Sequence, residues 1–126
     1  MDEQKPLILV ADDDGDALKI LKLILNRAGF VMESAQNGEK ALQRARELKP
    51  ALILLDTMMP TMSGYEALEH LRADPELSKI PVILISAGNP FDMVPGLQIS
   101  ADELLTKPTN VGEMLSLINK RLGRAP

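Results

Sequence analysis

Five polar side chains stand at or near the ends of short apolar runs, and their types suit phosphoryl chemistry: Asp12, Asp13, Asp56, Ser86 and Lys107. Carboxylates brought close together repel, and at about 4 Å with an effective dielectric of about 20 each pair costs roughly 4 kcal/mol. Such a cluster either holds a proton at a raised pKa or binds a cation. A small set of oxygen ligands suits Mg²⁺ better than Zn²⁺.

A carboxylate can also attack phosphorus and form an aspartyl phosphate. A metal ion and a lysine would neutralise the charge that develops on the transferring group, which is the main help that phosphoryl transfer needs. The residues alone therefore indicate a Mg²⁺-dependent phosphoryl site with Asp56 or Asp12 as the acceptor. Each residue taken singly has an ordinary explanation, because Asp is common in turns and a lone Ser or Lys is commonly solvated. Their joint placement is what favours a site.

Hydrophobic patterning predicts the elements that must position these side chains. Continuous apolar runs at Leu7–Ala11, Ala51–Asp56 and Val82–Ser86 predict strands buried on both faces, as in a parallel sheet. Phe30–Ala35 and Glu103–Thr106 complete a set of five strands. Because helical segments alternate with the strands, the pattern predicts one parallel sheet with right-handed crossovers and helices on both faces. The carboxyl ends of parallel strands meet at one edge, so we expect the five side chains to converge there.

Apolar residues that recur every three or four positions predict the helices. In Gly15–Ala28 the predicted buried face consists of Ala17, Leu21, Ile24 and Ala28, and Gly29 has the place of a left-handed cap. The last helix has a predicted buried stripe that consists of Val111, Met114, Leu115, Ile118 and Leu122. Between Ala87 and Ser100, two prolines permit at most a short or broken helix.

Length and composition exclude several classes of function. We expect the 126 residues to form one domain, residues 1–126, with a loose N-terminus at residues 1–6 and no effector domain in this sequence. The absence of cysteine excludes disulfides and thiolate chemistry. With no signal peptide and no apolar stretch long enough to span a bilayer, we expect a cytoplasmic protein without membrane insertion. A net charge of −4 argues against direct nucleic-acid binding, because phosphate backbones require a basic surface.

Four motifs resemble the receiver domain of two-component response regulators, including the chemotaxis receiver. These motifs are Ile8–Asp14, Leu54–Pro60 with Gly64, Val82–Ala87 and Leu105–Pro108, and the match covers nearly the whole chain. The resemblance implies an α/β, flavodoxin-like, doubly wound sheet of five parallel strands in the order 2-1-3-4-5.

The resemblance also implies a role for each matching residue. Asp56 would accept a phosphoryl group from a sensor histidine kinase or a phosphotransfer protein, and the phosphorylated domain would then bind an output partner. The implied Mg²⁺ ligands are Asp13, Asp56 and the carbonyl of Met58, with Asp12 acting through water. Lys107 would pair with the acyl phosphate, and Ser86 would hydrogen-bond its oxygen and draw the following loop inward. The chain would not be an enzyme but a phosphoacceptor that assists its own phosphorylation and dephosphorylation, and its Lys107–Pro108 bond would be cis.

The sequence departs from the family pattern at the positions linked to switching. Leu104 stands where receivers commonly have Tyr or Phe, and Thr109 stands where Phe is usual. We therefore hypothesise that activation works mainly by reshaping the loop Ala87–Gly96. Met58 and Gly88 occupy the two positions that tune phosphate lifetime, and neither can position an attacking water, so we expect a long-lived phosphoryl group.

Three other functions compete with this interpretation. Asp12-x-Asp14 also occurs in haloacid-dehalogenase-type phosphatases, which would make Asp12 the nucleophile, although the chain is short for that class and Asp16 stands where Thr or Val is usual. A receiver-like interaction module that is never phosphorylated would not need the intact set of five residues. An EF-hand would need Gly and Glu where Ala17 and Leu23 stand, which argues strongly against a calcium loop.

Overall fold

Five parallel strands form a single sheet in the order β2-β1-β3-β4-β5. The structure is a computed structural model that describes residues 5–87 and 101–124. The strands are β1 (Leu7–Ala11), β2 (Val31–Ala35), β3 (Leu52–Asp56), β4 (Val82–Ser86) and β5 (Glu103–Thr106). Every neighbouring pair is parallel and in continuous register. The predicted flavodoxin-like class and strand order are confirmed.

The sheet is buried on both faces, as the continuous apolar runs predict. All residues of β3 and β4 are buried. Successive residues of a strand face opposite sides, so Ile53 and Leu55 enter one core cluster while Leu52 and Leu54 enter the other. This two-sided core fixes the central strands, whose carboxyl ends carry the polar residues.

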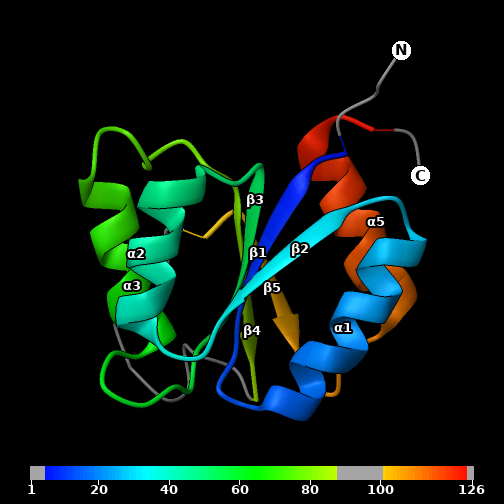
Figure 1. Ribbon diagram of the computed structural model, residues 1–126, viewed down its shortest axis with the longest axis horizontal. Helices are drawn as coiled ribbons and strands as arrows, with labels where there is room; N and C mark the ends of the chain where they lie inside the picture. Colours follow the sequence, from blue (N-terminus) through cyan, green and yellow to red (C-terminus); the bar gives the residue numbers. More distant parts are fainter. Residues whose placement is uncertain (1–4, 88–100, 125–126) are drawn as a thin grey trace.

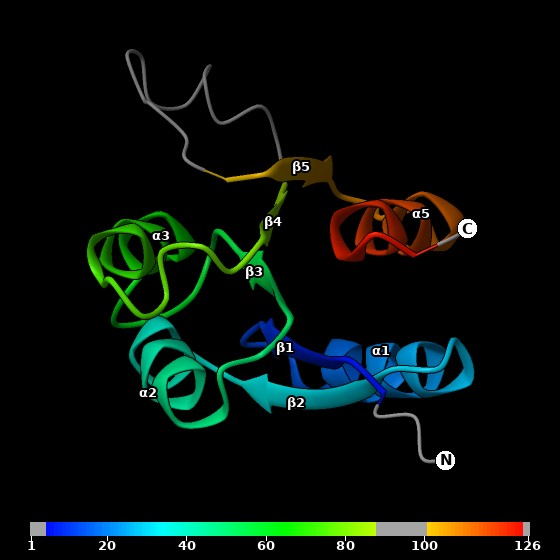
Figure 2. The same cartoon turned by 90° about the horizontal axis from the view of Figure 1, so that it is seen from above.

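Helices cover both faces of the sheet, and the molecule has three layers (Figures 1 and 2). On one side lie α2 (Gly38–Leu48) and α3 (Gly64–Ala73), and on the other lie α1 (Gly15–Arg27) and α5 (Val111–Leu122). Each helix begins at a polar residue whose side chain accepts a backbone N–H of the first turn, which is the usual N-cap arrangement. These caps are Asp14, Asn37, Ser63 and Asn110.

Two helix faces differ from the predicted ones. In α1 the buried residues are Leu18 and Leu25, whereas Leu21 and Ile24 are only partly buried. Side chains spaced three or four positions apart form neighbouring rows along a helix. How α1 is rotated against the sheet decides which of these rows is most deeply buried. Val111 is 42% exposed and does not belong to the buried stripe of α5, because it lines a groove described below. The expected left-handed cap is observed at Gly29, which has φ 93°.

Several predictions concern residues 1–4 and 88–100, which lie outside the described residues. They include most of the loose N-terminus, the broken helix before Ser100, the reshaping of the loop Ala87–Gly96 and the role of Gly88. Across the two described ranges, none of the helices combines the length and the apolar character that crossing a bilayer requires.

Candidate functional site

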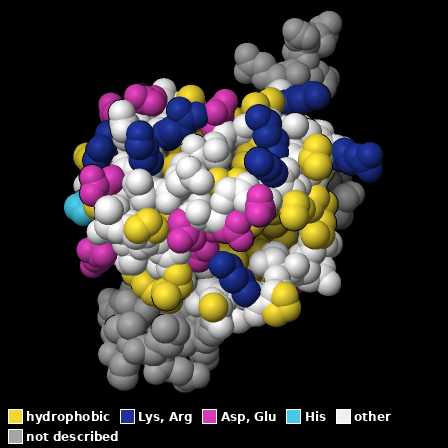
Figure 3. Space-filling model, turned by 60° about the horizontal axis from the view of Figure 1, so that its bottom comes forward, with side chains coloured by type: hydrophobic (Ala, Val, Ile, Leu, Met, Phe, Trp, Pro, Cys, Tyr) yellow, Lys and Arg dark blue, Asp and Glu magenta, His cyan; other side chains and the backbone are white. Residues whose placement is uncertain are grey.

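The structure brings the predicted side chains together at the carboxyl edge of the sheet. Asp56 and Ser86 end β3 and β4, Asp12 follows β1, and Lys107 follows β5. One carboxylate oxygen from each of Asp12, Asp13 and Asp56 lies within 4.8 Å of the others. Figure 3 shows acidic side chains gathered near the middle of this edge, next to a basic side chain. Segments distant in sequence therefore meet at one small surface.

Asp56 lies at the centre of the site and is held in one orientation. Only 2% of its surface is exposed. Its Oδ1 accepts a hydrogen bond from the backbone N–H of Met58 at 3.1 Å, and its Oδ2 accepts one from Lys107 Nζ at 2.9 Å. Charge-assisted bonds of this kind are stronger than neutral ones. The carboxylate is therefore oriented before any substrate arrives.

Charge and burial act on two neighbours of Asp56. Burial raises the pKa of Asp12, and the negative charge of Asp56 adds to this, against the opposing effects of the Asp14 backbone N–H and of Lys107. Burial alone would lower the pKa of Lys107, but its hydrogen bond to Asp56 and the nearby carboxylates raise it overall. Lys107 is thus held as a cation, while burial, together with the charge of Asp56, disfavours the ionised form of Asp12.

The donor set fits a small divalent cation. Three carboxylates face one lysine at this edge, so one ammonium leaves a net negative charge. Oxygen-only ligands with room for water suit Mg²⁺, which commonly binds through one or two carboxylates and retains several waters. The residues present therefore fit the Mg²⁺ implied by the resemblance.

Ser86 and Thr57 complete the buried polar part of the site. Their exposed fractions are 1% and 2%. The backbone N–H of Lys107 donates to the carbonyl of Ser86 at 2.7 Å, which ties the end of β5 to the end of β4. The Lys107–Pro108 bond is cis, as the resemblance implied. Thr57 was not predicted as a site residue, although it directly follows Asp56 in the sequence.

A groove of about 500 Å³ opens beside the acidic cluster, and it was not predicted from the sequence. It is lined by residues of α1 and of the start of α5, and Asp12, Asp13 and Lys107 also line it. Its apolar lining includes Ile20, Leu21, Ile24, Pro108, Val111 and Met114. Ile20 is 58% exposed, and the signal for it in the sequence is an apolar residue that falls outside the predicted buried face of its helix.

The raised pKa of Asp12 predicts a pH-dependent gain in stability for Asp12→Asn. The folded state holds a proton on Asp12 at pH values where the unfolded chain has already lost it, so the wild type loses stability as pH rises from about 4 through the raised pKa. The Asp12→Asn variant does not lose this stability, because Asn has no carboxyl group to titrate. We expect a gain of no more than about 1 kcal/mol at pH 7, because the side chain is partly solvated.

Urea unfolding at pH 3.5 and pH 7 measures this difference, which should be absent at the lower pH. Added Mg²⁺ should make the wild type the more stable of the two proteins at pH 7, because a cation that binds the folded wild type stabilises it. Equal stability of the two proteins at pH 7 without Mg²⁺ would contradict the raised pKa.

Comparisons with known proteins agree with this geometry. The family model described as "Response regulator receiver domain" matches residues 8–119. The DNA-binding response regulator MtrA of Mycobacterium tuberculosis is 37% identical over 98% of this chain and 54% of its own length. The chain spans about half the length of the curated relatives that it matches.

Solved structures of receiver domains have the same fold. The signal receiver domain of a histidine kinase from Syntrophus aciditrophicus has TM-score 0.87 and 34% identity, covering 94% of this chain and 90% of its own. The receiver domain of a sensor histidine kinase from Pseudomonas aeruginosa has TM-score 0.84 and 22% identity, covering 95% and 99%. That structure is described as having a magnesium ion coordinated in the active site cleft.

Proposed function

Since this chain belongs to the response regulator receiver domain family of two-component signalling, we propose that Asp56 is its phosphoacceptor. A phosphohistidine on a sensor histidine kinase or a phosphotransfer protein is the donor. An Asp56 oxygen attacks phosphorus, the P–N bond breaks, and its electron pair remains on the imidazole nitrogen. The product is an aspartyl phosphate that changes how the domain binds an output protein.

The observation that carries the proposal is the pairing of a nearly buried carboxylate with a lysine amid two further carboxylates. Lys107 Nζ lies 2.9 Å from Asp56 Oδ2. An ammonium at that distance can remain beside an oxygen of the transferred group and offset its charge. Ser86, at the end of the neighbouring strand, supplies the hydroxyl that bonds the phosphoryl oxygen.

We assign the metal site to Asp13, Asp56 and the carbonyl of Met58, with Asp12 acting through water. When bound, Mg²⁺ would offset the negative charge of the carboxylates and of the incoming phosphoryl group. The support within this chain is the closeness of the Asp12, Asp13 and Asp56 oxygens. The magnesium ion described for the Pseudomonas aeruginosa receiver is consistent with this assignment.

We place the partners of this domain among proteins. A net charge of −4 disfavours contact with DNA by the domain itself. MtrA is named as DNA-binding, and this chain covers 54% of its length. We therefore propose that this domain does not itself contact DNA.

Wild-type protein incubated with acetyl phosphate and Mg²⁺ is expected to gain the mass of one phosphoryl group. Intact-mass analysis measures the gain, and hydroxylamine should remove it, because an acyl phosphate is cleaved by strong nucleophiles. Chelation of Mg²⁺ by EDTA before incubation should reduce labelling at least about tenfold, since Lys107 alone would then have to balance the carboxylates and the phosphoryl group. Undiminished labelling in EDTA would contradict the proposed metal site.

A further inference from the structure

The β3–α3 loop, residues 57–63, has a tight and strained turn next to the acceptor strand. Thr61 has φ 63°, a left-handed conformation that a β-branched residue rarely adopts. The N–H of Met62 donates to the carbonyl of Pro60 at 2.7 Å, which closes the turn. A conformation of this kind persists where surrounding contacts impose it.

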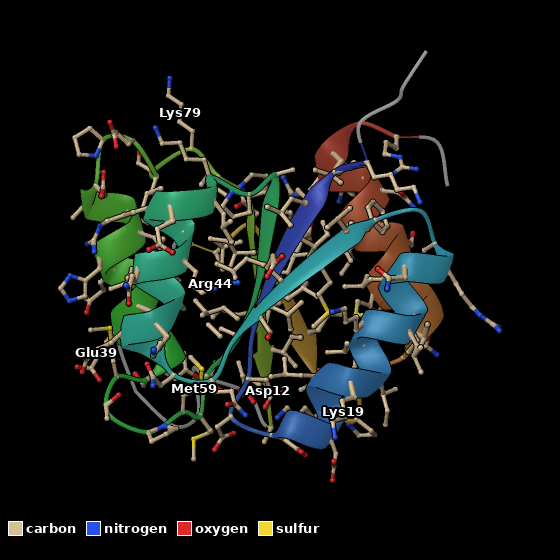
Figure 4. All side chains as sticks on the ribbon, viewed as in Figure 1. Asp12, Lys19, Glu39, Arg44, Met59 and Lys79 are labelled. Carbon is tan, nitrogen blue, oxygen red and sulfur yellow. The ribbon has the colours of Figure 1, made fainter. Side chains whose placement is uncertain are left out.

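Gly38, the first residue of α2, provides such a contact. A Cβ atom at Gly38 would lie 2.4 Å from the carbonyl oxygen of Met62, 2.7 Å from its Cβ and 2.9 Å from its Cγ. No side chain fits in that space, so the missing Cβ is what allows α2 and the loop to approach. Met62 also packs against the core cluster beside α2 and α3. In Figure 4, Glu39 at the start of α2 and Met59 in the loop both lie toward the edge that carries Asp12.

The loop carries Met58, which connects this contact to the site. The N–H of Met58 donates to Asp56 Oδ1, and the proposed function assigns its carbonyl to Mg²⁺. Backbone hydrogen bonds hold the two ends of the loop, from Thr57 N–H to the Ile85 carbonyl and from Gly64 N–H to the Thr57 carbonyl. Met62, near the α3 end of the loop, is the residue that approaches Gly38 closely.

We propose that Gly38 is a positioning residue for the Mg²⁺ site. By leaving room for Met62, it holds the β3–α3 loop in its strained conformation and so fixes both the N–H and the carbonyl of Met58. The inference rests on the proposed function, because it takes that carbonyl as a metal ligand. It adds a residue that faces neither metal nor phosphate and acts through the shape of the loop.

Gly38→Ala is expected to weaken Mg²⁺ binding about tenfold, the range seen when groups that orient metal ligands are lost. Amide NMR shifts followed during a Mg²⁺ titration measure the affinity, and hydrogen exchange of the Met58 amide should become faster. The control is Leu25→Ala, a buried residue of α1 in the core cluster on the other face of the sheet. It lowers stability through a core cavity and should leave both the Mg²⁺ affinity and the exchange of Met58 unchanged.

Met62→Ala tests the same contact from the side of the loop, and it decides the matter if Gly38→Ala does not fold. Because Met62 is only partly buried, we expect the variant to fold and to bind Mg²⁺ several-fold more weakly than wild type. Wild-type affinity in the folded variants would overturn the positioning role. Failure of the wild type itself to bind Mg²⁺ would instead overturn the proposed metal site, so the two failures are distinguishable.

Discussion

Asp56→Asn is expected to abolish phosphoryl labelling by acetyl phosphate, with no residual mass increase. The amide oxygen that replaces the carboxylate carries no charge and is a poor nucleophile toward phosphorus. The neighbours that orient Asp56 remain in place, because an Asn side chain at this buried position can still accept from Met58 N–H or Lys107 Nζ. Loss of labelling would therefore report the chemistry of the acceptor and not a collapse of the site.

Asp12→Asn is the matched control, because it removes one carboxylate from the same cluster. If Asp12 acts on Mg²⁺ through water, labelling should slow by about 10–100-fold but still reach the same mass. The opposite pattern, with labelling lost in Asp12→Asn and kept in Asp56→Asn, would identify Asp12 as the nucleophile, as in haloacid-dehalogenase-type phosphatases. A wild type that takes up no label would favour the interaction module that is never phosphorylated.

Gly64→Ala is expected to destabilise the fold by about 3 kcal/mol and to displace the acceptor, because no space exists for the added methyl. A Cβ at Gly64 would lie 2.1 Å from the carbonyl oxygen of Asp56 and 2.8 Å from both the Asp56 carbonyl carbon and Thr57 Cα. These are backbone atoms at the end of a fully buried strand, so they cannot yield as the tip of a flexible side chain can. Denaturant unfolding measures the loss, and the labelling rate should fall with it.

Gly15→Ala is the control for this substitution. Gly15 is also the first residue of a helix that follows a polar cap, and the nearest atom to its added Cβ would be Gln36 Nε2 at 3.5 Å. That contact is an ordinary one, so stability should stay the same or rise by about 0.5–1 kcal/mol from the lower backbone entropy of Ala. Equal effects at the two glycines would show that the close approach at Gly64 has no energetic consequence.

Much of this fold follows from local patterns. The runs Leu7–Ala11, Leu52–Asp56 and Val82–Ser86 are apolar at almost every position, and only a strand covered on both faces buries such a run fully. Parallel strands then share a carboxyl edge, so the convergence of Asp12, Asp56 and Ser86 could be predicted without coordinates. The motif resemblance supplied the strand order, which the structure confirms.

The packing of helices and loops could not be predicted in the same way. Periodicity predicted Ala17, Leu21, Ile24 and Ala28 as the buried face of α1, whereas packing on the sheet buries Leu18 and Leu25 most deeply. Ile20 and Val111 are far apart in sequence, and only the placement of α1 beside α5 makes them walls of one groove.

The sequence by itself determined which strands exist, on which edge their polar residues gather, and which chemistry those residues suit, because burial and charge repulsion act on residue types and local spacing. Only the tertiary structure decided the distances between Asp12, Asp13, Asp56 and Lys107, and the glycine contacts that hold the loop beside them. Such contacts join backbone atoms of segments distant in sequence. Their closeness depends on how whole elements pack, which no local pattern records.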